Sequence, residues 1–428
     1  MKPAATPSVL FRLNRDRLRA LLPKSSLAIL NANDIMPTNA DGTMGHHQNA
    51  DLYYLTGVRQ EETILVLAPD AVDEKLREVL FLREPSEHLA TWEGHKLGKD
   101  EARRISGIEN VKWLAAFPGA LRQLMCESER VYLNSNEHSR AVVEVESRDA
   151  RFVRECRRRY PLHEYRRLAP LMHQLRAVKA HPELEFIRKA CDLTRDGLLR
   201  VMRFVKPGVG EAEVEAELAH EFIRRGGRFA YPPIIAAGAN NCVLHYGAND
   251  QVCRRGQLLL LDVGASCGGY MSDLTRTIPV SGRFSRRQRR VYNAVLRVFR
   301  ALVKELVPGK RLRETRAAAE ALVEKELIDL GLLTAAEIRR QDPENPAVRR
   351  YLMHGVSHPI GLDVHDVHPA DATIAAGWVV TCEPAIYVKE EGFGIRLENT
   401  IWVTEKGAVD LMADIPIEAD EIEQIMNG

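Results

Sequence analysis

Residues 258–277 read LLLLDVGASCGGYMSDLTRT, an apolar run with one carboxylate, Asp262, and a second, Asp273, after a glycine pair. The run is typical of a buried strand, where an ionised carboxylate costs free energy unless it is paired or binds a cation. The midpoint of the two aspartates falls between Cys267 and Gly268, where a hairpin turn is expected. In a symmetric hairpin their side chains lie directly opposite, with Cβ atoms about 5 Å apart.

Two bare carboxylates at that distance repel each other, so either one is protonated or a metal ion lies between them. The alternative is an edge-strand aspartate followed by an unrelated turn aspartate. The pattern recurs near the C-terminus, where Glu383 and Glu398 flank the turn-like residues 389–392. We therefore expect a second hairpin with one inward-facing carboxylate on each strand, and two such pairs in one domain favour a metal site over chance.

Histidines gather between these carboxylate pairs. His354 and His358 are four residues apart, and His365 and His368 follow. The zinc-peptidase sequence HExxH is absent, and a glycine and a proline beside these residues disfavour a helix. Taken alone, each histidine is better explained by a surface position or a satisfied position in the core than by a functional site. Their clustering in an apolar, glycine-punctuated stretch favours a site.

Four carboxylates and one imidazole form an oxygen-rich set of ligands. Such a set suits Mn²⁺, Co²⁺ or Fe²⁺ better than it suits a thiolate-preferring metal. Two ions bridged by carboxylates, about 3.5–4 Å apart, can hold a hydroxide and polarise a carbonyl group. The chemistry that the sequence predicts is therefore hydrolysis.

The composition is that of a globular protein with at least two domains. The chain has 428 residues, of which 45% are hydrophobic and 28% charged. Its 60 Lys and Arg nearly balance 59 Asp and Glu, which argues against a nucleic-acid or anionic-membrane partner. No stretch reaches the ~18 apolar residues that span a bilayer. The seven cysteines form no CxxC pair, which indicates a reducing compartment, and we predict a cytoplasmic protein.

The two halves of the chain differ in their expected organisation. Up to about Pro170, short strand-like runs at 27–30, 64–67, 79–82 and 131–133 alternate with helix-like segments, which is an α/β pattern. We place the boundary near residues 177–181, giving an N-terminal α/β domain, 1–176, and an α+β domain, 177–428. The arginine-rich stretch 148–167 contains interleaved acids, so we interpret it as a solvated helix face or connector, the alternative being a basic patch for a polyanion.

The order Asp262, Asp273, His358, Glu383, Glu398 resembles the five-ligand set of the pita-bread (creatinase/aminopeptidase-like) metallopeptidases, which include methionine aminopeptidase, prolidase and aminopeptidase P. The sequences NCVLHY (241–246), LDVG (261–264), GLDVHD (361–366) and GIRLE (394–398) resemble the aminopeptidase P branch. In the N-terminal half, NADLYYLTG (49–57) and WEG (92–94) resemble that branch's N-terminal domain. The resemblance therefore covers nearly the whole chain.

This resemblance implies a C-terminal pita-bread catalytic domain that binds two divalent metal ions, most often Mn²⁺, with Co²⁺, Fe²⁺ or Zn²⁺ as alternatives. Asp273 and Glu398 would serve both ions. The implied ligands are Asp262, Asp273, His358, Glu383 and Glu398.

The resemblance also implies roles toward the substrate. Glu383 would act as general base, and His245 and His365 would contact the substrate near the scissile amide. His354 would line the pocket, and Arg396 would hold tyrosine or aspartate partners. The chain departs from the usual pattern at Asn399, where an aspartate is common, and at Pro359, where a bulkier residue is common.

The implied substrate is a peptide with proline in second position. Proline's tertiary amide has no N–H, so the site needs a proton donor for the departing nitrogen and an apolar wall, part of which residues 231–235 are expected to form. Prolidase, which cleaves dipeptides only, is the alternative. A metal-free creatinase-like hydrolase and an inactive binding module are disfavoured by the complete ligand set. Trp92 is expected either at a subunit contact of a homo-oligomer (a dimer or tetramer) or in its own domain's core.

Overall fold

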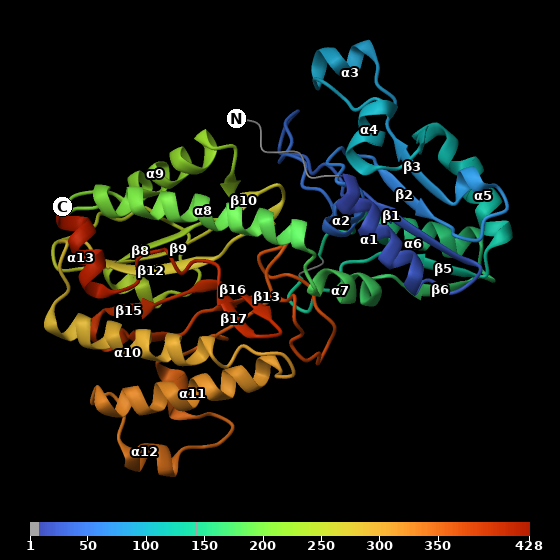
Figure 1. Ribbon diagram of the computed structural model, residues 1–428. Coiled ribbons are helices and arrows are strands. Elements are labelled where there is room, and N and C mark those ends of the chain that lie inside the picture. Colours follow the sequence, from blue (N-terminus) through green and yellow to red (C-terminus); the bar gives the residue numbers. More distant parts are fainter. Residues whose placement is uncertain (1–7, 142–143) are drawn as a thin grey trace. The chain divides into compact units, whose positions relative to one another are not determined.

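The computed structural model describes residues 8–141 and 144–428, and the contacts within it divide the chain into two units, one ending at Arg176 and the other beginning at Ala177 (Figure 1). No helix among these residues is long and apolar enough to cross a membrane.

The N-terminal unit is built on one mixed sheet. Its strands are β1 (Ser26–Asn31), β2 (Ile64–Leu67), β3 (Glu78–Leu82), β4 (Asn110–Trp113), β5 (Arg130–Leu133) and β6 (Glu164–Arg167). Its helices are α1 (Ser8–Leu21), α2 (Ala50–Thr56), α3 (Glu87–Trp92), α4 (Lys99–Ser106), α5 (Phe117–Glu127), α6 (Arg148–Arg159) and α7 (Ala169–Ala177).

The sheet has the strand order β4-β3-β2-β1-β5-β6, with β2 antiparallel to both β1 and β3 and the remaining neighbours parallel. The four runs predicted as strands are confirmed as β1, β2, β3 and β5. Alternate residues of β1, Leu27 and Ile29, join a core cluster that includes Phe117 and Leu121 of α5 and Cys156 of α6. These two helices therefore cover one face of the sheet.

The C-terminal unit combines six helices with short antiparallel sheets in the described residues. The helices are α8 (His181–Phe204), α9 (Glu211–Arg224), α10 (Arg286–Val303), α11 (Leu312–Asp329), α12 (Ala335–Arg340) and α13 (Ala419–Asn427). The strands are β7 (Arg228–Phe229), β8 (Ile234–Ala237), β9 (Leu258–Val263), β10 (Ala265–Cys267), β11 (Tyr270–Met271), β12 (Leu274–Pro279), β13 (Val379–Cys382), β14 (Ala385–Val388), β15 (Phe393–Arg396), β16 (Asn399–Thr404) and β17 (Gly407–Asp410).

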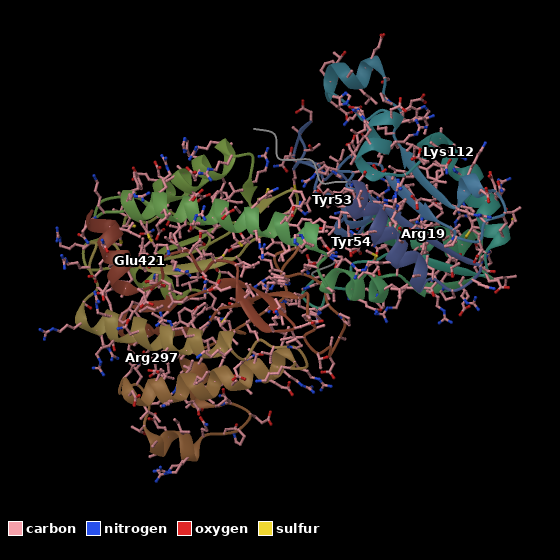
Figure 2. The ribbon with its side chains drawn as sticks, viewed as in Figure 1. Arg19, Tyr53, Tyr54, Lys112, Arg297 and Glu421 are labelled. Carbon is pink, nitrogen blue, oxygen red and sulfur yellow. The ribbon has the colours of Figure 1, made fainter. Side chains whose placement is uncertain are left out.

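Helices cover these strands on two sides. Within this unit, α8 and α9 lie on one side of the β8, β9 and β12 sheet, and α10 lies on the other (Figure 1). Arg297 of α10, labelled in Figure 2, donates to Glu326 of α11 at 2.8 and 2.5 Å, which ties the outer helix to the inner one. The strands that carry the carboxylates thus lie inside a helical shell.

The first predicted hairpin forms, but its predicted register is wrong by two residues. Asp262 pairs with Thr275 instead of Asp273. The reason is the turn, because Gly268 and Gly269 make it with positive φ angles of 60° and 94°, and only glycine adopts both readily. Since side chains alternate along a strand, a shift of two residues keeps Asp273 on the same face as Asp262.

The second hairpin has the predicted register. Cys382 pairs with Asn399 on one side and Ala385 with Arg396 on the other, so the same register places Glu383 opposite Glu398. The turn lies at 389–392 as expected and closes at Gly392, where φ is 70°.

A buried polar cluster fixes the start of α8. Tyr270 Oη donates to Glu183 Oε1 at 3.0 Å, and the Ala180 N–H donates to Glu183 Oε2 at 2.7 Å. Lys179 and Asp366 form an ion pair of 2.9 Å beside it, with both side chains 1% exposed. Burial raises the pKa of Glu183 to about 7, against the lowering effect of the Ala180 N–H, the Lys179 charge and the Tyr270 hydroxyl.

We predict that Glu183→Gln removes a pH-dependent part of the free energy of unfolding. The pKa of Glu183 is higher in the folded state, so the stability that this carboxyl contributes is complete below its unfolded pKa of 4.5 and is lost as pH rises through about 7. Denaturation experiments at about pH 5 and about pH 8 test this. As pH rises from the lower to the higher value, the free energy of unfolding of wild type should fall by on the order of 2–3 kcal/mol more than that of the variant. Glu405→Gln, at an exposed position, should follow wild type. A wild-type–variant difference that is equal at both pH values would contradict the prediction.

Candidate metal centre

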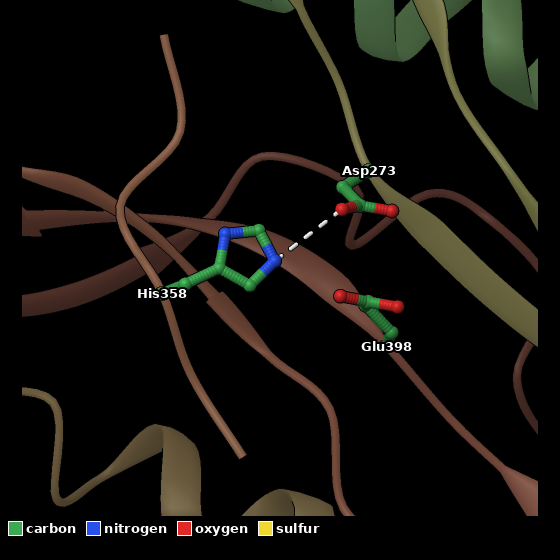
Figure 3. Close-up of side chains that lie close together, drawn as sticks. All are labelled: Asp273, His358 and Glu398. Atoms are coloured by element: carbon green, nitrogen blue, oxygen red, sulfur yellow. Dashed lines mark ion pairs between the residues drawn. The ribbon is translucent and has the colours of Figure 1, made fainter. Parts of the chain in front are cut away.

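Three buried side chains from separate elements converge in the C-terminal unit. Asp273 immediately precedes β12, His358 lies before β13, and Glu398 lies between β15 and β16. One ligand atom from each lies within 4.8 Å of the other two (Figure 3). His358 Nε2 is 3.5 Å from Asp273 Oδ2. Two carboxylates and an imidazole in this arrangement are ligands that a divalent ion accepts.

The two hairpins join at one backbone bridge, between Thr275 and Glu398. Glu398 N donates to Thr275 O at 3.0 Å, and Thr275 N donates back to Glu398 O at 3.3 Å. The Thr275 hydroxyl then donates to Glu398 Oε2 at 2.7 Å. At Asp273, the Thr400 hydroxyl accepts from the backbone N–H at 3.1 Å and donates to the backbone carbonyl at 3.0 Å. Backbone pairing and two threonines thereby fix the backbone at both acidic residues and the carboxylate of Glu398.

Asp262 lies next to this group, held by two partners. Arg396 Nη2 donates to its Oδ2 at 2.5 Å, and Tyr231 Oη donates to its Oδ1 at 2.7 Å. The same Tyr231 oxygen also contacts Asp273 Oδ1. A phenol has one proton and can donate to only one of the two carboxylates. The second contact therefore requires a proton on Asp273 or a cation shared by both groups.

Glu383 approaches the same ring nitrogen of His358 as Asp273 does and also lies near His354. Its Oε1 is 3.7 Å from His358 Nε2, and its Oε2 is 3.5 Å from His354 Nδ1. The structure therefore brings all five predicted ligands to one place, with Asp273, His358 and Glu398 at the centre.

The electrostatics of the centre favour a positive ion. Burial raises the pKa of Asp273 well above its ordinary value, and the charge of Asp262 adds to this effect. Burial and the charge of Asp273 raise the pKa of Glu398, and burial and the charge of Glu398 raise that of Glu383. Asp273, Glu383 and Glu398 therefore each resist ionisation beside the other acids. Divalent cations remove this repulsion, so the donor set and its charge both fit the metal that the sequence implies.

His354 belongs to a hydrogen-bonded chain that reaches Asp262. Its Nδ1 donates to Gly355 O at 2.5 Å, so its Nε2 accepts from Tyr387 Oη at 2.8 Å. Tyr387 in turn accepts from Arg396 Nη1 at 2.6 Å. Burial, with the nearby charge of Arg396, lowers the pKa of His354 to about 3, so this imidazole is neutral. The expectation that Arg396 holds tyrosine and aspartate partners is confirmed in Tyr387 and Asp262.

The other predicted histidines occupy different places. The ring centroid of His365 is 3.9 Å from that of His358, beside the centre. His245 is exposed in the loop after the short helix at 238–242, close enough for its charge to lower the pKa of His354. His368 instead packs against Trp378, with centroids 5.7 Å apart.

Sequence reasoning missed the roles of Tyr231, Thr275 and Tyr387. Tyr231 was assigned to an apolar wall, but its hydroxyl contacts two aspartates, 31 and 42 residues away. No local pattern marks such a partner, because the contact depends on how a loop crosses a distant hairpin. The unusual Asn399 donates from its side chain to Asp410 Oδ2 at 2.7 Å.

Comparisons with known proteins agree with this geometry. Residues 185–405 match metallopeptidase family M24, and residues 11–132 match the aminopeptidase P N-terminal domain. The Xaa-Pro aminopeptidase of Escherichia coli K12 is 31% identical over 435 residues, which cover 97% of each chain. The structure of Zn-substituted E. coli aminopeptidase P in complex with product has a TM-score of 0.87 and 31% identity over 99% of each chain. That of Pseudomonas aeruginosa aminopeptidase PepP has a TM-score of 0.87 and 30% identity, covering 99% of this chain and 98% of the other.

We predict that Mn²⁺ added to chelator-treated protein raises its Tm. An ion that binds only the folded state adds about 2.7 kcal/mol at a hundred times its Kd, which corresponds to a rise of on the order of 3–5 °C, because the entropy of unfolding grows with chain length. Thermal unfolding followed by dye fluorescence measures the shift. Asp273→Asn should lose most of it, whereas Asp329→Asn, at an exposed helix end, should keep it. An unchanged Tm in the wild-type protein would show that the carboxylates hold protons instead of metal.

Proposed function

Because this chain belongs to metallopeptidase family M24 and carries an aminopeptidase P N-terminal domain, we infer that it is a metallo-aminopeptidase that hydrolyses the bond between an N-terminal residue and a following proline. The observation that carries this inference is the convergence of Asp273, His358 and Glu398 in a chain that matches Xaa-Pro aminopeptidase over its whole length. The N-terminal domain match favours this activity over a strict Xaa-Pro dipeptidase.

We propose that Asp262, Asp273, His358, Glu383 and Glu398 hold two divalent ions, Mn²⁺ in the working enzyme. When bound, such ions polarise the scissile carbonyl and lower the pKa of a water molecule. Support comes from the raised pKa values of Asp273, Glu383 and Glu398. Because these carboxyl groups repel one another when ionised, bound cations stabilise their charged forms. Tyr231 and Arg396 orient Asp262 through hydrogen bonds to its two carboxylate oxygens.

The remaining roles follow from where the side chains lie. Glu383, between His354 and His358, takes the proton of the attacking water at its carboxylate. His365, beside His358, and the exposed His245 contact the substrate near the scissile amide and stabilise the negative oxygen that develops there. His354 lines the pocket as a neutral imidazole, and Arg396 aligns Asp262 through their ion pair.

Three further features belong to the proposal. The catalytic domain begins at Ala177, where the second compact unit starts. The enzyme works in the cytoplasm. It forms a dimer or tetramer through a surface that includes Trp92. The alternative that Trp92 packs in its own domain's core is wrong, because this side chain is 76% exposed at the end of α3. Sedimentation that finds an active monomer would exclude the oligomer.

We expect Glu383→Ala to lose more activity than His354→Ala. Removing Glu383 takes away a ligand and the base together, whereas a pocket histidine contributes typically about 10²–10⁴-fold. The measurements are kcat/KM on an Xaa-Pro peptide and the metal content of each variant. Glu390→Ala, in the exposed turn of the same hairpin, should retain wild-type values. Equal losses in the two site variants would disprove the role of Glu383 as base.

Peptides longer than two residues should be cleaved when proline is second. A matched panel of Xaa-Pro, Xaa-Pro-Xaa and Xaa-Ala-Xaa, assayed with the same metal, tests both length and proline specificity. We expect cleavage of Xaa-Pro-Xaa and little of Xaa-Ala-Xaa. Cleavage of the dipeptide alone would identify a prolidase, and cleavage of no proline peptide would refute the proposed function.

A further inference from the structure

The N-terminal unit contains a cavity of about 380 Å³ between α5 and α6. It lies where β1 ends at Asn31 and β2 begins at Ile64. Its apolar wall includes Phe117 and Leu121 of α5 and Phe152 of α6, and the two phenylalanine rings lie 6.0 Å apart between centroids. Small-molecule sites are of this size and are largely apolar with a few polar groups.

One face of α6 gives the cavity a positive rim. Arg148, Arg151, Glu155 and Arg159 all line it, and their spacing of three or four residues places them on one side of the helix. The arginine-rich stretch therefore does more than form a solvated helix face, because three of its guanidinium groups border a hollow in the unit.

The three arginines differ in how they are paired. Arg159 forms an ion pair with Glu155 at 3.0 Å, and Arg151 forms one with Asp34 at 2.7 Å. The Arg148 side chain makes no hydrogen bond or ion pair within residues 8–141 and 144–428. An arginine is always charged and carries five donors, so a half-buried one without an acceptor is unusual.

The acids near Arg148 do not compensate for this. Asp149, next to it in the chain, is buried and accepts from Asn31 Nδ2 at 2.9 Å. Burial raises the pKa of Asp149 to about 7, so it is only partly ionised at neutral pH. Burial also outweighs the attraction of Glu62 and Asp34 and lowers the pKa of Arg148. The guanidinium thus lacks a direct acceptor among the described residues, and the nearby acids act on its charge without a hydrogen bond or an ion pair to it.

We propose that this cavity binds a small amphipathic anion, whose charged group is bound by Arg148 and whose apolar body packs against Phe117, Leu121 and Phe152. A carboxylate or a phosphate supplies the charge, since the planar guanidinium donates two parallel hydrogen bonds to either. The apolar body has the size of a bicyclic aromatic ring or a short acyl chain. This site is separate from the proposed peptidase chemistry, and binding is measured without any peptide.

The test uses isothermal titration of the full-length, metal-loaded protein with four probes. These are 1-naphthoate, 1-naphthyl phosphate, the neutral 1-naphthalenemethanol, and acetate, which has the charge without the ring. We expect 1-naphthoate or 1-naphthyl phosphate to bind with a Kd below about 1 mM, and the neutral alcohol and acetate to bind at least about tenfold more weakly. Comparison of the two anions decides between carboxylate and phosphate.

Variants on α6 locate the site. Arg148→Met should weaken binding of the anion at least about tenfold, and Arg148→Lys should have an intermediate effect, because it keeps the charge and loses the paired donors. Arg158→Met, at an exposed position on the same helix outside the cavity, is the matched control and should bind as wild type does. Unchanged binding in Arg148→Met, which would place the probe elsewhere such as at the metal centre, overturns the proposal. So does equal binding of the neutral alcohol by wild type, a result that needs no variant to fold.

Discussion

The crowding of four carboxylates into one small volume, with Asp273 and Glu398 buried, is the constraint on which the catalytic unit depends. Burial and mutual repulsion raise the pKa values of Asp273, Glu383 and Glu398 together. Hydrogen bonds of the surrounding fold must offset this repulsion and hold the carboxylates in place. The shared bridge at Thr275 and Glu398 does this, since it locks two hairpins, more than 120 residues apart in the chain, into one rigid frame.

The same constraint explains the side chains around the cluster. Arg396 is buried, which disfavours its charge, but Tyr387, Asp262 and the other acids raise its pKa overall, so it stays a cation beside Asp262. Through Tyr387, this arginine also orients His354 as a neutral imidazole. Ligand, cation, phenol and pocket histidine therefore form one network, and a change at any member alters the alignment of the rest.

Much of this arrangement could be predicted, and the errors have local causes. The second hairpin has its predicted register because residues 389–392 form a turn with a single glycine at its end, which leaves one solution. The first hairpin turns at two adjacent glycines, Gly268 and Gly269. The midpoint of the two aspartates instead placed the turn between Cys267 and Gly268, so the predicted register was wrong. The prediction of a shared site survived, because an error of two residues leaves both side chains on one face. The contact between Tyr231 and Asp262 could not be predicted, since Tyr231 reaches the aspartate from a loop.

The sequence by itself determined the two-domain α/β and α+β organisation, the two hairpins and the candidate residues for a metal site. Those properties follow from apolar periodicity, glycine positions and residue chemistry, all of which are local. Only the tertiary structure decided that Asp273, His358 and Glu398 lie within reach of one ion. It also decided that Asp262 forms an ion pair with Arg396, and that Arg148 lines a cavity and has no acceptor of its own in the part of the chain that the structure describes. These are contacts between segments far apart in the chain, and the distance between such segments is set by packing, which no local pattern encodes.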